Sequence, residues 1–198
     1  MEAIQSHKHY TYADYLTWPD DVRYEIIDGI AYMMAAPSST HQEISMEVST
    51  QLSNFLRGGS ARVYAAPLDV RLNFDSGDDI VLQPDILVVC DRSKIDKRGC
   101  NGAPDLVIEI LSPSSVTYDM TLKFSKYLQH GVREYWVIDP ESRAVIVHIM
   151  QGANHAKTHA YKDTDIIPVE VLDGCSIDMN EVFSERGNDD DDDERNPQ

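Results

Sequence analysis

Two acidic residues stand in apolar surroundings where a charge is costly. Glu109 lies within the apolar run 106–111, and Asp85 interrupts the run 83–89 in the same way. Burying an unpaired carboxylate costs several kcal/mol or more, so such groups are usually paired, protonated or bound to a metal. Continuous runs rich in β-branched residues are typical of strands covered on both faces. Two acids in adjacent core strands therefore indicate a functional site.

The spacing of these residues favours convergence on one space. Side chains alternate across a strand, so Gln83, Asp85 and Leu87 are expected on one face of the first strand. Val107 and Glu109 share a face of the second. Mg²⁺ is commonly held by one or two carboxylates together with substrate phosphate and water. We expect Mg²⁺ at Asp85 and Glu109, with Mn²⁺ as a substitute; the alternative is that each acid forms a structural salt bridge with a core lysine or arginine.

A lysine follows in the next predicted element. Residues 119–131 predict a helix, because apolar residues recur at helical spacing and a glycine is placed to end it. Lys123 falls inside the apolar stripe, between Met120 and Tyr127, whereas Lys126 points away and is expected to be solvated. A lysine on such a stripe can also extend its stem to water. Asp119, one turn earlier, is expected to orient Lys123, although an acid also suits the first turn of a helix.

Several longer strings carry a family resemblance. The strings QPDILVVCD, APDLVIEILSPSS and GVREYWVIDP, with the D-x-x-x-K helix between the last two, resemble the putative restriction endonuclease family of the PD-(D/E)XK nuclease superfamily. The similarity extends upstream to YTYADYL, RYEIIDG, APSSTHQ and APLDVRL, so it covers the chain from Tyr10 to about Phe183. It implies a restriction-endonuclease-like α/β fold and an Mg²⁺-dependent endonuclease that acts on DNA.

The resemblance also implies roles for individual residues. In that superfamily the PD aspartate and the acid of the (D/E)XK element hold Mg²⁺, which here correspond to Asp85 and Glu109. A lysine positions or activates the attacking water. This chain has Leu111 where the pattern has that lysine, and we assign the role to Lys123 as a migrated lysine. Glu25 matches the glutamate of the family's YE-x-x-x-G pattern, which implies a further metal or water ligand rather than an exposed strand acid.

Two upstream segments are expected to complete the pocket. Residues 22–36 predict two strands joined by a tight turn at Asp28-Gly29, and the first strand carries Glu25. Residues 38–57 predict a helix with Ser39 and Gln42 in capping-box spacing. Its predicted apolar stripe consists of Ile44, Val48, Leu52 and Phe55. His41 projects from the first turn and is either a structural core histidine or a group that supports the metal ligands or contacts phosphate.

The composition predicts one domain. With 198 residues, of which 42% are hydrophobic, the chain suits a single compact core. We expect a flexible N-terminus over residues 1–9, one domain over 10–184 and a disordered acidic tail over 185–198. The pattern of elements predicts an α/β fold with a central mixed β-sheet flanked by helices. Residues 144–150 and 155–161 are expected to extend this sheet as antiparallel edge strands.

The sequence also predicts where in the cell the protein is located. No stretch approaches the length of a membrane span, and the N-terminus lacks an apolar signal region, so we expect a cytoplasmic protein that does not enter a membrane. Three cysteines without a CxxC pair fit reduced thiols. A homodimer is one expected assembly.

The charge is unusual for an enzyme of nucleic acids. The chain carries a net charge of −17, whereas such enzymes ordinarily present a basic face to phosphates. Local basic clusters would have to provide the contacts, and the candidates are Arg57, Arg62, Arg92, Lys94, Lys97 and Arg98. The loop that carries the last four is equally expected to be a solvated connection. The acidity and the missing lysine at Leu111 keep an alternative open, in which the chain is a binding or regulatory module that retains the nuclease fold without efficient turnover.

Overall fold

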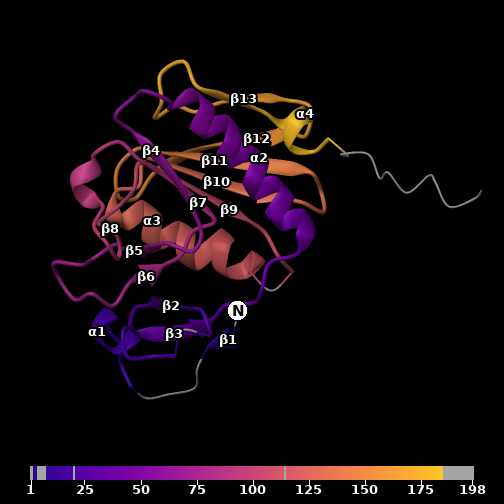
Figure 1. Ribbon diagram of the computed structural model, residues 1–198. Helices are drawn as coiled ribbons and strands as arrows, with labels where there is room; N and C mark the ends of the chain where they lie inside the picture. The colour runs from indigo at the N-terminus through magenta and orange to yellow at the C-terminus, as the bar shows by residue number, and fades with distance from the viewer. Residues whose placement is uncertain (1, 4–7, 20, 114, 185–198) are drawn as a thin grey trace, which may run out of the picture.

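The computed structural model describes residues 2–3, 8–19, 21–113 and 115–184. Its central element is a six-stranded mixed β-sheet with helices on both faces (Figure 1). Strands β9 and β10 run parallel, and the other neighbouring pairs are antiparallel. The strand order is β12 (Ala156–Lys162), β11 (Ala144–Met150), β10 (Glu134–Asp139), β9 (Leu106–Ile110), β7 (Ile86–Val89) and β4 (Arg62–Ala65). The expected mixed sheet and its antiparallel extension by β11 and β12 are confirmed.

A second sheet, which the sequence did not predict, lies beside the first. Its order is β1 (Glu2–Ala3), β3 (Ile30–Met33), β2 (Tyr24–Ile27), β6 (Val81–Leu82), β5 (Asp69–Arg71) and β8 (Gly99–Asn101). The expected hairpin is present as β2 and β3. Asp28 and Gly29 at its turn have φ values of 52° and 75°, which is the left-handed backbone that a tight two-residue hairpin turn requires.

The predicted continuous strand over residues 83–89 is wrong. The chain leaves the second sheet after Leu82 and enters the central sheet at Ile86. Pro84 lies at the crossing, where the chain changes hydrogen-bonding partners, and a proline has no N–H to offer a ladder. Asp85 therefore directly precedes a core strand, and Gln83 belongs to the junction between the sheets.

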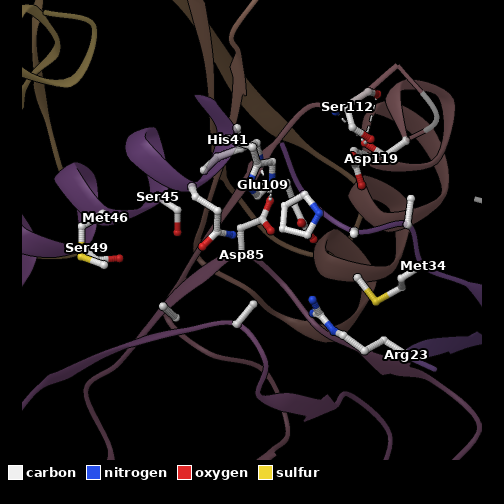
Figure 2. A pocket seen from close by; sticks show the side chains of 18 of the residues that line it. Arg23, Met34, His41, Ser45, Met46, Ser49, Asp85, Glu109, Ser112 and Asp119 are labelled. Atoms are coloured by element: carbon white, nitrogen blue, oxygen red, sulfur yellow. Dashed lines mark hydrogen bonds and ion pairs between the residues drawn. The ribbon is translucent and has the colours of Figure 1, made fainter. Parts of the chain in front are cut away.

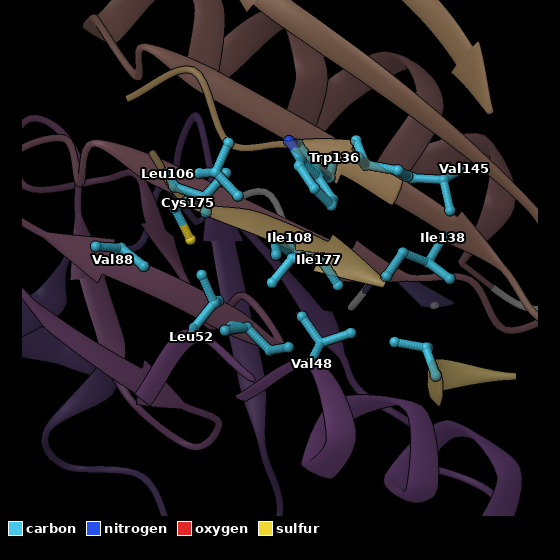
Figure 3. Close-up of a cluster of buried hydrophobic side chains, with 14 of the residues drawn as sticks. Val48, Leu52, Val88, Leu106, Ile108, Trp136, Ile138, Val145, Cys175 and Ile177 are labelled. Carbon is cyan, nitrogen blue, oxygen red and sulfur yellow. The ribbon is translucent and has the colours of Figure 1, made fainter. Parts of the chain in front are cut away.

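Helix α2 (Ser39–Phe55) covers one face of the central sheet. Its buried Val48 and Leu52 belong to the same core cluster as Val88 and Ile108 of the sheet (Figure 3). The capping residue is Ser38, whose Oγ accepts the backbone N–H of His41 at 3.2 Å, so the expected cap at Ser39 is one residue late.

The apolar stripe of α2 also ends differently from the prediction. Phe55 is 46% exposed, and the buried residue at this end is Leu56. The predicted place of Phe55 on the buried face is therefore wrong, because the last turn of the helix turns Phe55 outward while Leu56 continues the contact with the sheet.

The opposite face is covered by a helix that begins irregularly. A π-helical segment (Tyr118–Lys123) runs directly into α3 (Phe124–His130), and Gly131 ends the helix with a φ of 88°. The buried side chains are Asp119, Lys123 and Tyr127. Met120 is exposed, so its predicted place on the stripe is wrong; the wider π-helical turn changes which residues face the sheet.

Lys126 also differs from its expected solvated state. Its side chain is 14% exposed, and Nζ lies 2.7 Å from a carboxylate oxygen of Asp28 at the hairpin turn. This ion pair connects α3 to the second sheet.

Five short elements complete the fold of the described residues. They are α1 (Tyr12–Tyr15), a 3₁₀ helix (Arg92–Lys94), β13 (Ile166–Pro168), β14 (Ser176–Asp178) and α4 (Met179–Val182). Gln51 of α2 exchanges hydrogen bonds with the backbone of Asp178, so this C-terminal group packs on α2. No helix within the described ranges is long and apolar enough to cross a membrane. The acidic tail over residues 185–198, and residues 1 and 4–7 of the N-terminus, lie outside the described residues.

The packing of α2 makes a stability prediction. Leu52→Ala removes a fully buried side chain between helix and sheet and is expected to lower the free energy of unfolding by about 2–5 kcal/mol. Phe55→Ala, on the same helix, is expected to cost about 1 kcal/mol or less, because much of that side chain is in water. Urea denaturation followed by circular dichroism measures both, and equal losses would show that α2 packs differently.

Candidate active site

Asp85, directly before β7, lies opposite Glu109 of the neighbouring strand β9. Strands β7 and β9 are antiparallel in a register that joins Ile86 to Ile108, and one step beyond the end of β7 this register places Asp85 against Glu109. The backbone N–H of Ile110 donates to Asp85 Oδ2 at 2.8 Å. Both acids line a cavity of about 230 Å³, and their side chains lie together at its centre (Figure 2). The expected convergence of the two acids is therefore present.

His41 reaches this pair from the N-terminus of α2. Its Nε2 lies 3.0 Å from Asp85 Oδ2, and its side chain is buried. The Ser38 cap, which accepts the backbone N–H of His41, orients this first turn. Nδ1 is also buried and has no hydrogen-bond partner among the described residues. An Nε2–H that donates to Asp85 leaves a second Asp85 oxygen, Oδ1, for other partners.

Lys123 stands among three carboxylates that come from different elements. Its Nζ lies 3.1 Å from Glu25 Oε1 of β2, 3.1 Å from Glu109 Oε1 of β9 and 3.2 Å from Asp119 Oδ1 of the π-helical segment. The four side chains are at most 3% exposed. Tyr127, one turn beyond Lys123, donates its hydroxyl to Glu109 Oε1 at 2.9 Å. This group of five residues joins both sheets and α3 at the floor of the cavity.

This group contains three carboxylates and one ammonium, and the burial and closeness of these groups shift the pKa values of Glu109, Glu25 and Lys123. Burial raises the pKa of Glu109 well above its usual value; Lys123 opposes this rise, and Asp119, Asp85 and Glu25 add to it. Burial also raises the pKa of Glu25. Burial by itself lowers the pKa of Lys123, but the attraction of Glu109, Glu25 and Asp119 outweighs it and leaves the pKa well above its usual value. Lys123 is therefore firmly protonated.

The alternative of a purely structural salt bridge accounts for only part of this geometry. Glu109 does pair with a core lysine, as that alternative requires. One ammonium, however, is shared by three buried carboxylates, and Asp85 has a separate histidine partner. A structural pair does not need this excess of negative charge beside a cavity, whereas a cation-binding site does.

The remaining predicted residue, Gln83, makes contacts through both its main chain and its side chain. Its backbone N–H donates to Glu25 Oε1 at 2.8 Å and so helps to hold Glu25 beside Lys123. Its side chain turns away from Lys123 and accepts a hydrogen bond from Arg23 Nε at 2.8 Å. Sequence reasoning missed Arg23 and Tyr127. Strand alternation from Glu25 and helical spacing from Lys123 were the signals that could have found them.

The oxygen atoms at the cavity fit a hard divalent cation. Asp85 Oδ1 and Glu109 Oε2 accept no hydrogen bond from the described residues, and both side chains line the cavity. In the part of the chain that the structure describes, no three His, Cys, Asp or Glu side chains form a ready metal-ligand set. Mg²⁺ does not require one, since it keeps several waters and commonly takes one or two carboxylates.

Comparison with known proteins places this arrangement in a family. The model of the Uma2 family, described as "Putative restriction endonuclease", matches residues 12–180. This chain belongs to that family. The expected family and its nuclease-like α/β fold are thereby confirmed, and the match spans every residue of the site from Glu25 to Tyr127.

Two further similarities agree with the family membership. The protein slr1290 of Synechocystis sp., described as uncharacterised, is 30% identical over 127 residues; the match covers 63% of this chain and 65% of that protein, so this chain spans just under two thirds of its relative. A crystal structure from Anabaena variabilis, described as a putative nuclease belonging to DUF820, superposes with a TM-score of 0.72. It has 24% sequence identity and covers 88% of this chain and 98% of its own.

The basic residues that were candidates for phosphate contact do not line this cavity. Strand β7 begins beside Asp85 and ends at Val89, so the loop with Arg92 and Lys94 leaves its far end. Arg62 pairs with Val89 at that same end. Of the described side chains that line the cavity, the lysines and arginines are Lys123 and Arg23.

Replacing the buried Lys123 ammonium by an apolar side chain should destabilise the folded protein. Lys123→Met leaves three carboxylates buried together and is expected to lower the free energy of unfolding by about 3–5 kcal/mol at pH 7 without divalent cations. Lys126→Met, which breaks the more exposed pair with Asp28, is the matched control and is expected to cost about 1 kcal/mol or less. Similar losses in urea denaturation would argue against the three-carboxylate arrangement.

Replacing Glu109 by a neutral side chain should instead raise the free energy of unfolding, by an amount that depends on pH. A carboxyl whose pKa is raised on folding binds its proton more tightly in the folded state, so stability falls as pH rises above the usual pKa of 4.5. Glu109→Gln removes this penalty while Glu25 and Asp119 still neutralise Lys123. The variant is expected to be more stable than the wild type at pH 7.5, with a difference that shrinks toward pH 5.

This comparison is made by urea denaturation across pH in the presence of EDTA. Glu43→Gln, an exposed acid on α2, is the control and should track the wild type at every pH. A Glu109→Gln variant that is less stable at pH 7.5 would show that Glu109 is a necessary structural partner of Lys123.

Proposed function

We propose that this protein is a divalent-cation-dependent endonuclease that hydrolyses phosphodiester bonds of DNA. The observation that carries the proposal is the position of Asp85 and Glu109 opposite each other at a cavity, with Lys123 Nζ 3.1 Å from Glu109. Membership of a family described as putative restriction endonuclease supports nuclease chemistry, and the fold shared with a putative nuclease is consistent with it.

In this proposal each side chain has a distinct task. Asp85 and Glu109 hold Mg²⁺, with Mn²⁺ as a substitute, through the oxygens that the described residues leave without hydrogen bonds. When bound, the cation supplies a Lewis acid that polarises the phosphate and lowers the pKa of water. Lys123, which is protonated, orients the attacking water by donating a hydrogen bond and stabilises negative charge that develops near Glu109.

The supporting residues hold these groups in place. Glu25 and Asp119 flank the Lys123 ammonium, and His41 holds Asp85 from α2. The backbone of Gln83 holds Glu25. Such surrounding contacts keep reacting groups within a fraction of an ångström of a productive geometry, which is why their loss lowers activity without removing a ligand. Lys123 occupies the role that the family pattern gives to the position of Leu111.

A binding or regulatory module is the second candidate function. The net charge of −17 and the location of the basic loop at the far end of β7 favour it, because both weaken attraction for a long duplex. We also propose a cytoplasmic location, which the three unpaired cysteines support, and we keep a homodimer as an expected assembly. Turnover of a nucleic acid separates the two functions.

The cleavage prediction tests the metal ligands directly. The wild type is expected to cleave DNA with Mg²⁺ or Mn²⁺ and to stop when EDTA is added. Asp85→Asn and Glu109→Gln are each expected to lower the rate by roughly 10²–10⁴-fold and to weaken Mn²⁺ binding in calorimetric titration. Glu43→Gln, an exposed acid that does not line the cavity, should leave both unchanged.

The outcomes separate the two candidate functions. Mn²⁺ binding that is equal in the wild type and both site variants would place the metal elsewhere. A wild type that binds Mn²⁺ yet cleaves no DNA or RNA, whether single- or double-stranded, would favour the binding module.

A further inference from the structure

Arg23 directs an incompletely bonded guanidinium into the cavity. It directly precedes β2, lines the cavity with Asp85 and Glu109, and points toward them (Figure 2). Its Nε donates to Gln83 Oε1 at 2.8 Å. Its Nη2, however, is buried and has no hydrogen-bond partner among the described residues. Leaving a buried donor of a charged group unsatisfied costs about 1–3 kcal/mol or more, so the position suits a donor that is completed by a ligand.

The partner that holds Arg23 is itself held rigidly. Gln83 Nε2 donates to Asp69 Oδ1 and to the hydroxyl of Tyr15, both at 2.9 Å. These contacts fix the orientation of the amide, so Oε1 faces Arg23. Because Gln83 is neutral, it orients the guanidinium without neutralising it, and Arg23 makes no ion pair with the described carboxylates. The Arg23 guanidinium is therefore held in a fixed orientation while its positive charge is not neutralised by a described carboxylate.

The distribution of charge explains what this cation can bind. Lys123, the other lysine or arginine of the described lining, has its charge balanced by three nearby carboxylates. The basic loop lies at the far end of β7. An anionic substrate that approaches Asp85 and Glu109 therefore meets Arg23 as the uncommitted cation. The planar guanidinium fork matches the oxygens of a phosphate, and hydrogen bonds of this kind are charge-assisted and strong.

We propose that Arg23 forms a phosphate-binding subsite, in which Nη2 donates to a non-bridging oxygen of a substrate phosphodiester. The subsite rests on the proposed function for its position in the reaction, but binding of phosphate can be tested without turnover. Gln83 is a positioning residue in this arrangement, because it acts through Arg23 and does not touch the substrate.

The test uses Arg23→Gln, Arg23→Lys and a matched control. Arg71→Gln is the control, since Arg71 lies in β5 and does not line the cavity, and its guanidinium is already bound by Asp78 and Asn101. Calorimetric titrations measure binding of inorganic phosphate and of the dinucleotide TpT, each with Mg²⁺ and with EDTA. Arg23→Gln is expected to weaken binding of TpT by about 10-fold to 100-fold, Arg23→Lys by less, and Arg71→Gln not at all.

Stability and metal binding separate a substrate contact from a structural role. Arg23→Gln should keep the wild-type affinity for Mn²⁺ and should unfold at the same urea concentration as the wild type or a higher one, because it removes an unsatisfied buried donor. A variant that is destabilised but binds TpT as the wild type does would overturn the proposal, since Arg23 would then be structural.

The remaining outcomes distinguish this subsite from the proposed nuclease activity. Binding of TpT that depends on Arg23, in a protein that cleaves nothing, supports the subsite while the nuclease proposal fails. Cleavage by Arg23→Gln with unchanged kcat/KM overturns the subsite and leaves the nuclease proposal standing. A wild type that binds inorganic phosphate but not TpT overturns the phosphodiester assignment, and a wild type that binds neither overturns the subsite altogether.

Discussion

The rest of the site depends on the ion pairs that the Lys123 ammonium makes with Glu25, Glu109 and Asp119. These three partners come from β2, β9 and the π-helical segment, so one charge joins the second sheet, the central sheet and the helix on its face. Buried carboxylates this close cannot all ionise without a cation. The lysine therefore determines how closely these elements approach, and their approach determines the floor of the cavity.

The crossing at Pro84 places the other half of the site. Because the chain changes sheets between Leu82 and Ile86, Gln83 stays with Glu25 and Arg23 while Asp85 meets Glu109. A continuous strand would have kept Gln83 and Asp85 on one face of the same sheet. The break instead gives Gln83 and Asp85 separate tasks. Gln83 holds Arg23 and Glu25, and Asp85 presents its carboxylate beside His41.

An acidic protein can accommodate an anionic substrate if its few cations are placed well. Three carboxylates lie within 3.2 Å of the single positive charge of Lys123, so acidic side chains outnumber it at the cavity and suit a divalent cation. Arg23 is held by a neutral glutamine and keeps its charge. With a cation at Asp85 and Glu109, the cavity would present two positive groups to a phosphate. Long-range attraction for DNA would still be weak, because the basic loop lies at the opposite end of β7.

The sequence by itself determined the features that depend on local pattern. Apolar runs interrupted by single acids predicted Asp85 and Glu109 as candidate site residues, helical spacing predicted Lys123 as a third, and the Asp28-Gly29 turn predicted the β2–β3 hairpin that the structure contains. The residues around Asp85 and Glu109 also carried the family resemblance that the family match confirms. Each of these signals is contained within about ten neighbouring residues, where the alternation of a strand or the turn of a helix decides which way a side chain faces.

Only the tertiary structure decided which of these side chains meet. The second sheet, the gathering of Glu25 and Asp119 around one ammonium, and the orphaned Nη2 of Arg23 all depend on contacts between segments far apart in the chain. The π-helical turn changed the buried face before Lys123, and the direction of β7 carried the basic loop away from the acids. Local periodicity reports the face that a residue occupies within its own element, whereas register and packing between elements decide what lies opposite that face.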